Sequence, residues 1–169
     1  RFGTGIKFAI ATVLRGGGLI TIMRGEEVHT ISTVEKVIRD QPFEIVTLDG
    51  EPMGITTQLG RDWEPWMVLR EFGCNALDEG GAFGTEEDFS AVAGPDETTI
   101  IVTWPELDTA YKQRKELFLE GDPVWQSPKL RILPNPSAHV FYRGVRVFKL
   151  DKPSLLTYDI LAEQSLTED

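Results

Sequence analysis

Three polar side chains within residues 66–79 have the types and the spacing that metal and water chemistry requires. Glu71, Asn75 and Asp78 stand at i, i+4 and i+7 of the segment WMVLREFGCNALDE. A helix over this segment therefore places the two acids and the amide on one face. Apolar neighbours border the stripe, which favours a pocket holding a metal ion and an activated water. An ordinary amphipathic helix with a polar outer face explains the same spacing equally well.

A second candidate lies near the start of the chain. Residues 4–15 have helical apolar periodicity and end at three consecutive glycines, residues 16–18, which predicts a helix that stops there. Gly3 and Gly5 then lie at the N-terminus of this helix, where free N–H groups and the positive dipole end favour phosphate. Lys7 adds a positive charge in the first turn. Taken alone, a Gly-x-Gly before a helix is more often a turn than a phosphate site.

The string Arg-Glu-Phe-x-x-Asn-Ala-x-Asp, residues 70–78, resembles the asparagine box of the GHKL ATPases. This family includes gyrase, the ninety-kilodalton heat-shock chaperones, histidine kinases and MutL-type repair proteins. The resemblance implies that Glu71 is the general base for the attacking water. It also implies that Asn75 holds Mg²⁺ on the ATP phosphates and that Asp78 lies close to the nucleotide.

The string FGTGIKFAI resembles the glycine-rich lid of the same ATPases. The resemblance implies that Gly3, Thr4, Gly5 and Lys7 contact the phosphates. Residues 54–57, Gly-Ile-Thr-Thr, loosely resemble the element that places a threonine beside the adenine ring. Thr57 or its neighbour Thr56 is therefore a candidate adenine contact, with a plain surface strand threonine as the alternative.

Two departures from the family pattern shape the interpretation. The lid precedes the asparagine box here, whereas it follows the box in ordinary members, so a circular permutation is expected. The Asp-x-Gly-x-Gly box that recognises adenine is absent from these residues. In a permuted chain it falls upstream of Arg1, and we expect a domain truncated at its N-terminus. A degenerate site that no longer binds nucleotide is the alternative.

The pattern of elements predicts a single α/β (α+β) domain over residues 1–169. The expected architecture is a two-layer sandwich of the Bergerat type, with a mixed, mostly antiparallel sheet and helices on one face. The predicted elements are a meander of strands at 19–24, 28–37, 43–48 and 55–59, a helix at 66–79, a flexible loop at 80–95, a buried strand at 98–104, a surface helix at 107–120, a Pro-rich connector at 123–136, a hairpin at 138–150 turning at Arg143-Gly144, and a strand at 155–160.

Composition limits the classes of function. The chain has 27 Asp and Glu against 17 Lys and Arg, a formal net charge of −10, which disfavours direct nucleic-acid binding. No apolar run is long enough to span a membrane. The single cysteine, Cys74, fits a reducing compartment and a cytoplasmic location. His29 and His139 lack further ligands at metal-binding spacing and are interpreted as structural histidines.

The expected function is that of an ATP-binding domain with Mg²⁺-dependent, slow hydrolysis that drives a conformational change. A non-catalytic interaction module that keeps the fold but has lost the nucleotide is the alternative. A histidine-type kinase is a weaker one, because neither histidine lies in a predicted helix. A homodimer or a protein partner is compatible with either function. The use to which ATP is put is not encoded in the pocket residues.

Overall fold

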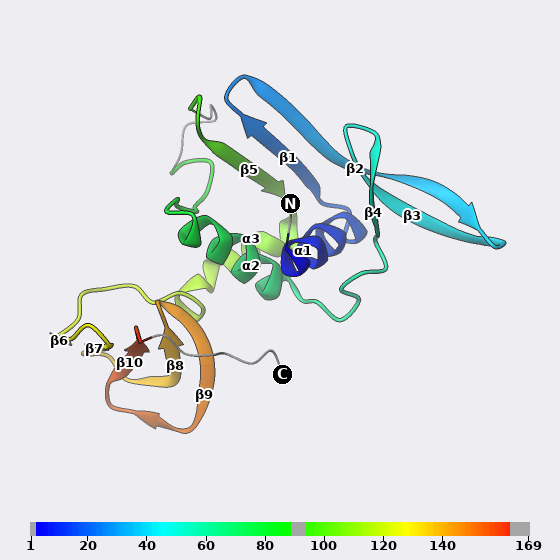
Figure 1. Ribbon diagram of the computed structural model, residues 1–169. Coiled ribbons are helices and arrows are strands. Elements are labelled where there is room, and N and C mark those ends of the chain that lie inside the picture. Colours follow the sequence, from blue (N-terminus) through cyan, green and yellow to red (C-terminus); the bar gives the residue numbers. More distant parts are fainter. Residues whose placement is uncertain (1–2, 89–93, 163–169) are drawn as a thin grey trace. The chain divides into compact units, whose positions relative to one another are not determined.

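The protein has an α+β fold, as expected. A computed structural model describes residues 3–88 and 94–162, and within these it contains three α-helices and two five-stranded sheets (Figure 1). The chain divides into two compact units, Arg1–Tyr111 and Lys112–Asp169. Close packing within each unit does not show that the two units fold independently. The single domain over residues 1–169 therefore stays a prediction.

The first unit contains a fully antiparallel sheet in the order β4-β3-β2-β1-β5. Neighbouring strands β1 to β4 follow one another in sequence, which confirms the predicted meander. The prediction of a buried strand at 98–104 is wrong, because β5 is an edge strand and several of its residues are exposed. The strands are β1 (Leu19–Arg24), β2 (Glu27–Ile38), β3 (Gln41–Leu48), β4 (Glu51–Thr56) and β5 (Thr98–Thr103).

The turn between β3 and β4 shows why the fourth strand begins earlier than predicted. Asp49 and Gly50 have φ values of 52° and 86°, so these two residues complete the turn and β4 starts at Glu51 rather than at residue 55. Pro52 lies within β4, which is tolerated because β4 is an edge strand.

Helix α1 (Thr4–Arg15) has the predicted bounds. It ends in a Schellman motif: the N–H of Gly18 donates to the Val13 carbonyl at 2.9 Å, and that of Gly17 donates to Leu14 at 3.0 Å. Gly17 has φ 77°, a conformation that glycine adopts without strain. The glycine run therefore both stops the helix and satisfies its last carbonyls.

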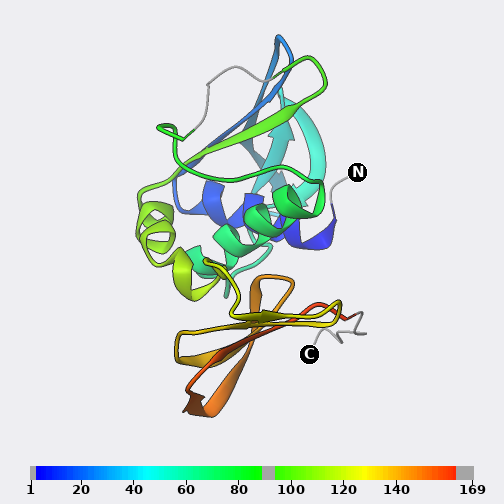
Figure 2. The same cartoon turned by 90° about the vertical axis from the view of Figure 1, so that its left-hand side faces the viewer.

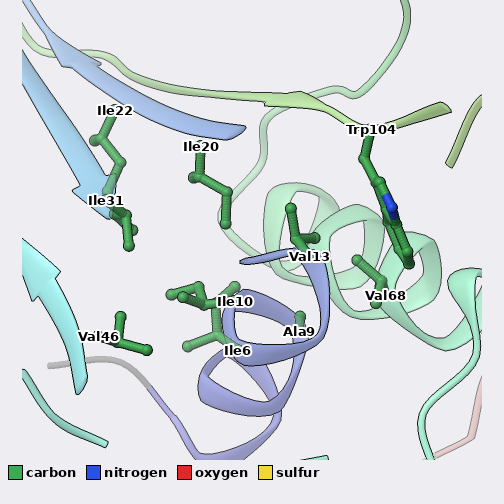
Figure 3. Packing of buried hydrophobic residues seen from close by; sticks show 10 residues of the cluster. All are labelled: Ile6, Ala9, Ile10, Val13, Ile20, Ile22, Ile31, Val46, Val68 and Trp104. Atoms are coloured by element: carbon green, nitrogen blue, oxygen red, sulfur yellow. The ribbon is translucent and has the colours of Figure 1, made fainter. Parts of the chain in front are cut away.

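The hydrophobic core of the first unit lies between sheet and helices (Figure 3). Ile6 and Ile10 of α1 point toward the sheet, while Ala9 and Val13 face α2 (Pro65–Asp78) and Trp104. Helices α1 and α2 thus cover one face of the sheet. The fully or nearly fully buried members are Ile6, Ala9, Ile10, Val13, Ile20, Ile22, Ile31, Val46, Val68 and Trp104.

The loop that joins β4 to α2 is fastened to the C-terminal end of α1 by Arg15. Its guanidinium donates to the carbonyls of Thr57 at 2.6 Å, Leu59 at 2.8 Å and Gly60 at 2.6 Å. Phe8 packs on Trp63 with ring centroids 5.3 Å apart, which holds the other end of the loop. The start of α2 is therefore positioned by contacts along α1.

The second unit contains a mixed sheet in the order β6-β7-β10-β8-β9, in which only the β10–β8 pair is parallel (Figure 2). The predicted hairpin and the last strand are confirmed, with Arg143 and Gly144 in the hairpin turn at φ 49° and 83°. The strands are β6 (Trp125–Gln126), β7 (Leu130–Leu133), β8 (Ser137–Tyr142), β9 (Val145–Ser154) and β10 (Thr157–Ile160).

Two predictions for residues 105–136 are wrong in extent. The expected helix over 107–120 is divided into α3 (Pro105–Lys112) and a short 3-10 turn, η1 (Arg114–Glu116). The expected connector over 123–136 contains strands β6 and β7, which pair with each other and with β10. Its prolines lie outside these two strands. The predicted loop at 80–95 falls partly outside the described residues.

Among the described residues, no helix has the length and apolar character needed to cross a membrane.

A buried acid holds the second unit together. Asp159 is 0% exposed; its Oδ2 accepts from Arg131 Nε at 2.8 Å, and its Oδ1 accepts from the Gly144 N–H at 2.8 Å. The carboxylate therefore joins β7, β10 and the β8–β9 turn. A buried charge is tolerated only when it is paired and hydrogen-bonded in this way.

The β3–β4 turn carries a charged pair. His29 Nδ1 lies 2.7 Å from Asp49 Oδ2, and Asp49 Oδ1 accepts the Thr30 N–H at 2.8 Å. The hydrogen bond to Asp49, with the negative charges of Asp49 and Glu27, raises the pKa of His29. The bond from the Thr30 N–H, with that from His29, lowers the pKa of Asp49.

We expect Arg15→Met to lower the free energy of unfolding by about 1–2 kcal/mol, since three hydrogen bonds to carbonyls are lost while the aliphatic stem is kept. Urea unfolding measures the change. Arg24→Met, at the exposed end of β1, is the control and should alter stability by less than about 0.5 kcal/mol. Equal effects of the two substitutions would show that the carbonyl contacts contribute nothing.

We expect stability to depend on pH through His29. Because its pKa is raised on folding, its contribution is fully present below the ordinary histidine value of about 6.5 and is lost as pH rises through the folded pKa. The Asp49 contribution, with a lowered pKa, is lost instead as pH falls through its folded value. An NMR titration of the ring protons measures the histidine pKa.

Asp49→Asn is the matched variant, because an asparagine keeps the acceptor for Thr30 and tolerates positive φ. It should bring the His29 pKa down toward its ordinary value. The second histidine, His139, serves as an internal control: burial and the nearby charges of Arg146 and Lys149 lower its pKa, and Asp49→Asn should leave it unchanged. An unchanged His29 titration in Asp49→Asn would contradict the pairing.

Candidate functional site

The predicted polar stripe is present on α2 (Pro65–Asp78). The Asn75 Nδ2 donates to the Glu71 backbone carbonyl at 2.7 Å and to the Glu71 Oε1 at 2.9 Å. The amide thus hydrogen-bonds both the backbone and the carboxylate of the residue one turn before it. Because Nδ2 makes both bonds, the Asn75 carbonyl oxygen is directed away from Glu71 and remains an acceptor.

The Glu71 carboxylate lies against Gly5, although the two residues are far apart in sequence. A Cβ atom added to Gly5 would fall 2.4 Å from Glu71 Oε1 and 2.5 Å from Oε2, well inside van der Waals contact. Gly5 is the second residue of α1, and Gly3 at the N-cap has no side chain with which to cap it. The carboxylate therefore rests at the N-terminus of α1, where only a glycine leaves room for it.

The electrostatics of this position are favourable for a negative charge. The first turn of α1 contains no acidic residue, so its free N–H groups and positive dipole end have no local counter-charge. A carboxylate near a helix N-terminus contributes about 0.3–1 kcal/mol. Glu71 supplies that charge from another helix. The free N–H groups and the positive dipole end also attract a phosphate. A carboxylate and a phosphate therefore suit the same position at the N-terminus of α1.

Gly5, Glu71 and Asn75 are the sequence-predicted residues that the described contacts bring together. Gly3 and Thr4 are exposed beside Gly5, and a Cβ at Gly3 would have no neighbour within 4 Å. Lys7 lies half-buried in the first two turns of α1. Asp78 is exposed at the last position of α2, on the same face as Asn75. The structure thus brings the lid-like and box-like segments together.

Thr57 does not belong to this group. It is 2% exposed, and its hydroxyl donates to Glu44 Oε2 at 3.0 Å. Its carbonyl accepts from Arg15 at the opposite end of α1. Ten helical residues separate Arg15 from Gly5, which corresponds to about 15 Å. The alternative interpretation, a plain surface strand threonine, is wrong as well, because Thr57 is buried and lies in the turn just after β4 (Glu51–Thr56).

The structure adds one positioning residue that the sequence did not indicate as such. Arg15 fastens the loop before α2 through its bonds to the carbonyls of Thr57, Leu59 and Gly60. The sequence signal for Arg15 was its place in the last turn of a helix, which is typical of dipole compensation rather than of a tertiary anchor. Only the folded chain brings the carbonyls of residues 57–60 to it.

The donor atoms of the site limit what it can hold. Within residues 3–88 and 94–162, no group of three or more His, Cys, Asp or Glu side chains could hold a metal ion. The oxygen donors here are the Glu71 carboxylate and the Asn75 amide. Such a pair fits Mg²⁺ only when phosphate oxygens complete its coordination.

Cys74 lies beside the stripe but is poorly suited to nucleophilic chemistry. Burial raises the pKa of its thiol to about 11, with a lowering effect of Arg70 and raising effects of Asp78 and Glu71. The reactive thiolate is therefore scarce at neutral pH.

We expect the native Cys74 to react with a thiol reagent about 100-fold more slowly than the urea-unfolded chain at pH 8, because raising the pKa from 9.0 to about 11 depletes the thiolate by that factor. Stopped-flow absorbance with a disulfide reagent measures both rates. Equal rates in the native and unfolded chains would contradict the burial of the thiol.

Comparison of the chain with protein-family models, with curated proteins and with solved structures finds no match in any of the three.

Proposed function

We propose that the chain is a circularly permuted member of the GHKL class that binds ATP with Mg²⁺ at the N-terminus of α1 and hydrolyses it slowly. The observation that carries the proposal is the contact between Gly5 and the Glu71 carboxylate. These residues belong to the two segments that separately resemble the phosphate-binding lid and the asparagine box. An ordinary polar helix face has no need of a glycine-rich helix start beside it.

The proposed phosphate site uses the backbone of α1. The free N–H groups after Gly3, with Thr4 and Lys7 beside them, would bind the terminal phosphates. Phosphate and the Glu71 carboxylate suit the same position, so Glu71 would turn aside when the nucleotide binds. Its carboxylate contacts Gly5 with the far end of a flexible side chain, which makes that movement inexpensive.

The proposed catalytic group is Glu71, which would accept a proton from the attacking water. Asn75 holds this carboxylate through Nδ2 and leaves its own carbonyl oxygen for the metal. A Mg²⁺ ion bound with the triphosphate would neutralise charge on the phosphate oxygens. Asp78, one turn further along the same face, would lie near the nucleotide. The adenine contact assigned to Thr57 is not part of the proposal, given its burial.

Sheet architecture supports the same interpretation at a coarser level. Two helices on one face of an antiparallel sheet are compatible with a Bergerat-type layer arrangement. ATP use and the free thiol fit a cytoplasmic protein.

A second candidate is a non-catalytic interaction module. It is favoured by the same contact, because the Glu71 carboxylate already supplies the negative charge that the N-terminus of α1 attracts. In that case Gly5 and Glu71 serve only to pack α1 against α2.

Thermal unfolding of the full-length protein with ATP and Mg²⁺ tests the proposal. At a ligand concentration of about 100 times Kd, binding should stabilise the protein by about 2.7 kcal/mol, and Tm should rise by several degrees. Asn75→Ala should abolish the shift. Glu71→Gln should keep the shift and lower turnover by at least about 100-fold, since it removes the base but not the side-chain shape. A phosphate-release assay measures turnover.

Alanine variants of Gly5 and Gly3 form a matched pair that tests the contact between Gly5 and the Glu71 carboxylate. Gly5→Ala displaces the carboxylate, whereas Gly3→Ala meets no atom within 4 Å. Neither glycine has a positive φ in the described structure, so neither substitution strains the backbone. If neither ATP nor ADP shifts Tm at any concentration tested, the interaction module is the correct function.

A further inference from the structure

Strand β5 (Thr98–Thr103) forms one edge of the sheet in the first unit (Figure 1). It pairs with β1, and within residues 3–88 and 94–162 no other strand and no further backbone hydrogen bond engages it. In an antiparallel pair only every second residue directs its N–H and C=O groups toward the neighbouring strand. The alternate residues of β5 therefore direct theirs outward, away from β1.

The composition of β5 is unusual for an edge strand. It reads TTIIVT and contains no charged residue, proline or glycine. Edge strands are normally protected from further pairing by charges, prolines, bulges or short length. The other three edges have such features: β4 contains Pro52 and pairs with a register shift, β6 has two residues, and β9 contains Pro153 with Lys149, Asp151 and Lys152. Among the four edges, β5 alone lacks them.

The side chains of β5 suit a strand with neighbours on both sides. An apolar, β-branched run of this kind predicts a buried strand, whereas the structure places it at an edge. Val102 packs against the core, and Ile100, two residues away on the same face, is 36% exposed. A strand added beside β5 would cover Ile100 and would pair with the outward backbone groups.

The chain around this edge is strongly acidic. Residues 71–111 contain ten Asp and Glu but no Lys, Arg or His. Asp96 and Glu97 come directly before β5, while Glu106 and Asp108 follow it in the first turn of α3. A neutral strand is therefore bordered by negative charge at both of its ends.

This arrangement of charge disfavours a second copy of the chain as the partner. Antiparallel pairing of two β5 strands would bring the Asp96 end of each copy beside the Glu106 end of the other. Parallel pairing would bring like ends together, and in both cases acids approach acids. A strand with basic ends would meet opposite charge instead. The one basic residue of β1, Arg24, lies opposite Thr98 and is followed by two acids in the β1–β2 turn.

We propose that the outer edge of β5 binds an extended segment of a partner protein, with β-branched residues at its centre and Lys or Arg at its ends. In this mode of recognition the backbone hydrogen bonds of the added strand supply affinity, and its side chains supply specificity. The acids at the two ends of β5 select the basic flanks and steer the encounter. The edge itself contains no residue of the proposed nucleotide site, so nucleotide binding is not required.

Fluorescence anisotropy of a labelled peptide, KRTVTVTKR, added to the full chain tests the proposal. We expect saturable binding that weakens as salt rises from about 50 to about 200 mM, because exposed charges are screened. The peptide EDTVTVTED should bind at least about 10-fold more weakly, since its ends meet like charge. KRTVTVTKR with N-methyl groups on its central residues keeps the charges but cannot donate backbone hydrogen bonds there. Undiminished binding of the methylated peptide, or no binding of the parent peptide at low salt, would overturn the proposal.

Hydrogen exchange measured by NMR locates the contact. In the free chain, alternate amides of β5 should exchange fast and the others slowly, because only those paired with β1 are protected. The peptide KRTVTVTKR should slow the fast set. Slow exchange of every β5 amide in the free chain would show that the edge is already covered, by the chain itself or by a second copy, and would refute the proposal.

Charge-matched variants test the acidic ends of the strand. Asp96→Asn and Glu106→Gln should each raise the Kd for KRTVTVTKR by about 1.5- to 5-fold, as expected for exposed charge pairs. Asp40→Asn is the control: it removes the same charge nine residues beyond Ile31, where the pairing of β2 with β1 ends. Asp40 has φ 61°, which asparagine tolerates. The thermal midpoint checks that each variant is folded. Equal effects of the three substitutions would show unspecific attraction to an acidic chain and would contradict binding at β5.

Discussion

The close approach of α1 and α2 is the constraint on which the candidate site depends. Small residues make this approach possible. Gly5 leaves room for the Glu71 carboxylate, and Ala9 is 0% exposed between the helices (Figure 3). A larger residue at Ala9 would push α2 outward, whereas one at Gly5 would displace the Glu71 carboxylate. Because Glu71 is carried by α2, the distance between the helices sets where its carboxylate lies relative to the N-terminus of α1.

The other end of α1 is fixed by contacts of a different kind. The Trp104 indole lies directly on Gly16, where a Cβ would come within 2.7 Å of the ring, and Gly18 leaves similar room. The indole nitrogen is buried without a hydrogen-bond partner among the described residues, which costs about 1–3 kcal/mol. Loss of a buried Trp side chain typically costs about 3–5 kcal/mol, so the packing outweighs this penalty. Both ends of α1 are therefore anchored, and its N-terminus is held in place.

The two units differ in chemistry as well as in packing. The first is strongly acidic and contains the helix N-terminus with the Glu71 carboxylate against it. The second, Lys112–Asp169, is close to neutral, with 9 Lys and Arg against 8 Asp and Glu, and is organised around Asp159 and Arg131. Net charge calculated over the whole chain averages these two surfaces.

The sequence by itself determined the local features of this protein. The glycines after Arg15 ended a helix, the Asp49-Gly50 and Arg143-Gly144 pairs turned hairpins, and the spacing of Glu71, Asn75 and Asp78 put them on one helical face. Each of these outcomes depends on residues within a few positions of one another. The short strands β6 and β7 were missed because two to four residues carry too little periodicity to be recognised.

Only the tertiary structure decided which distant segments meet. Gly5 and Glu71 are brought together by the packing of α1 on α2, and Thr57 is carried to the far end of α1 by Arg15. The row of paired residues Trp125, Ile132, Tyr158, Val140 and Phe148 likewise exists only through strand order, since its members come from five different strands. Such juxtapositions depend on nonlocal burial and register, which local propensity does not encode.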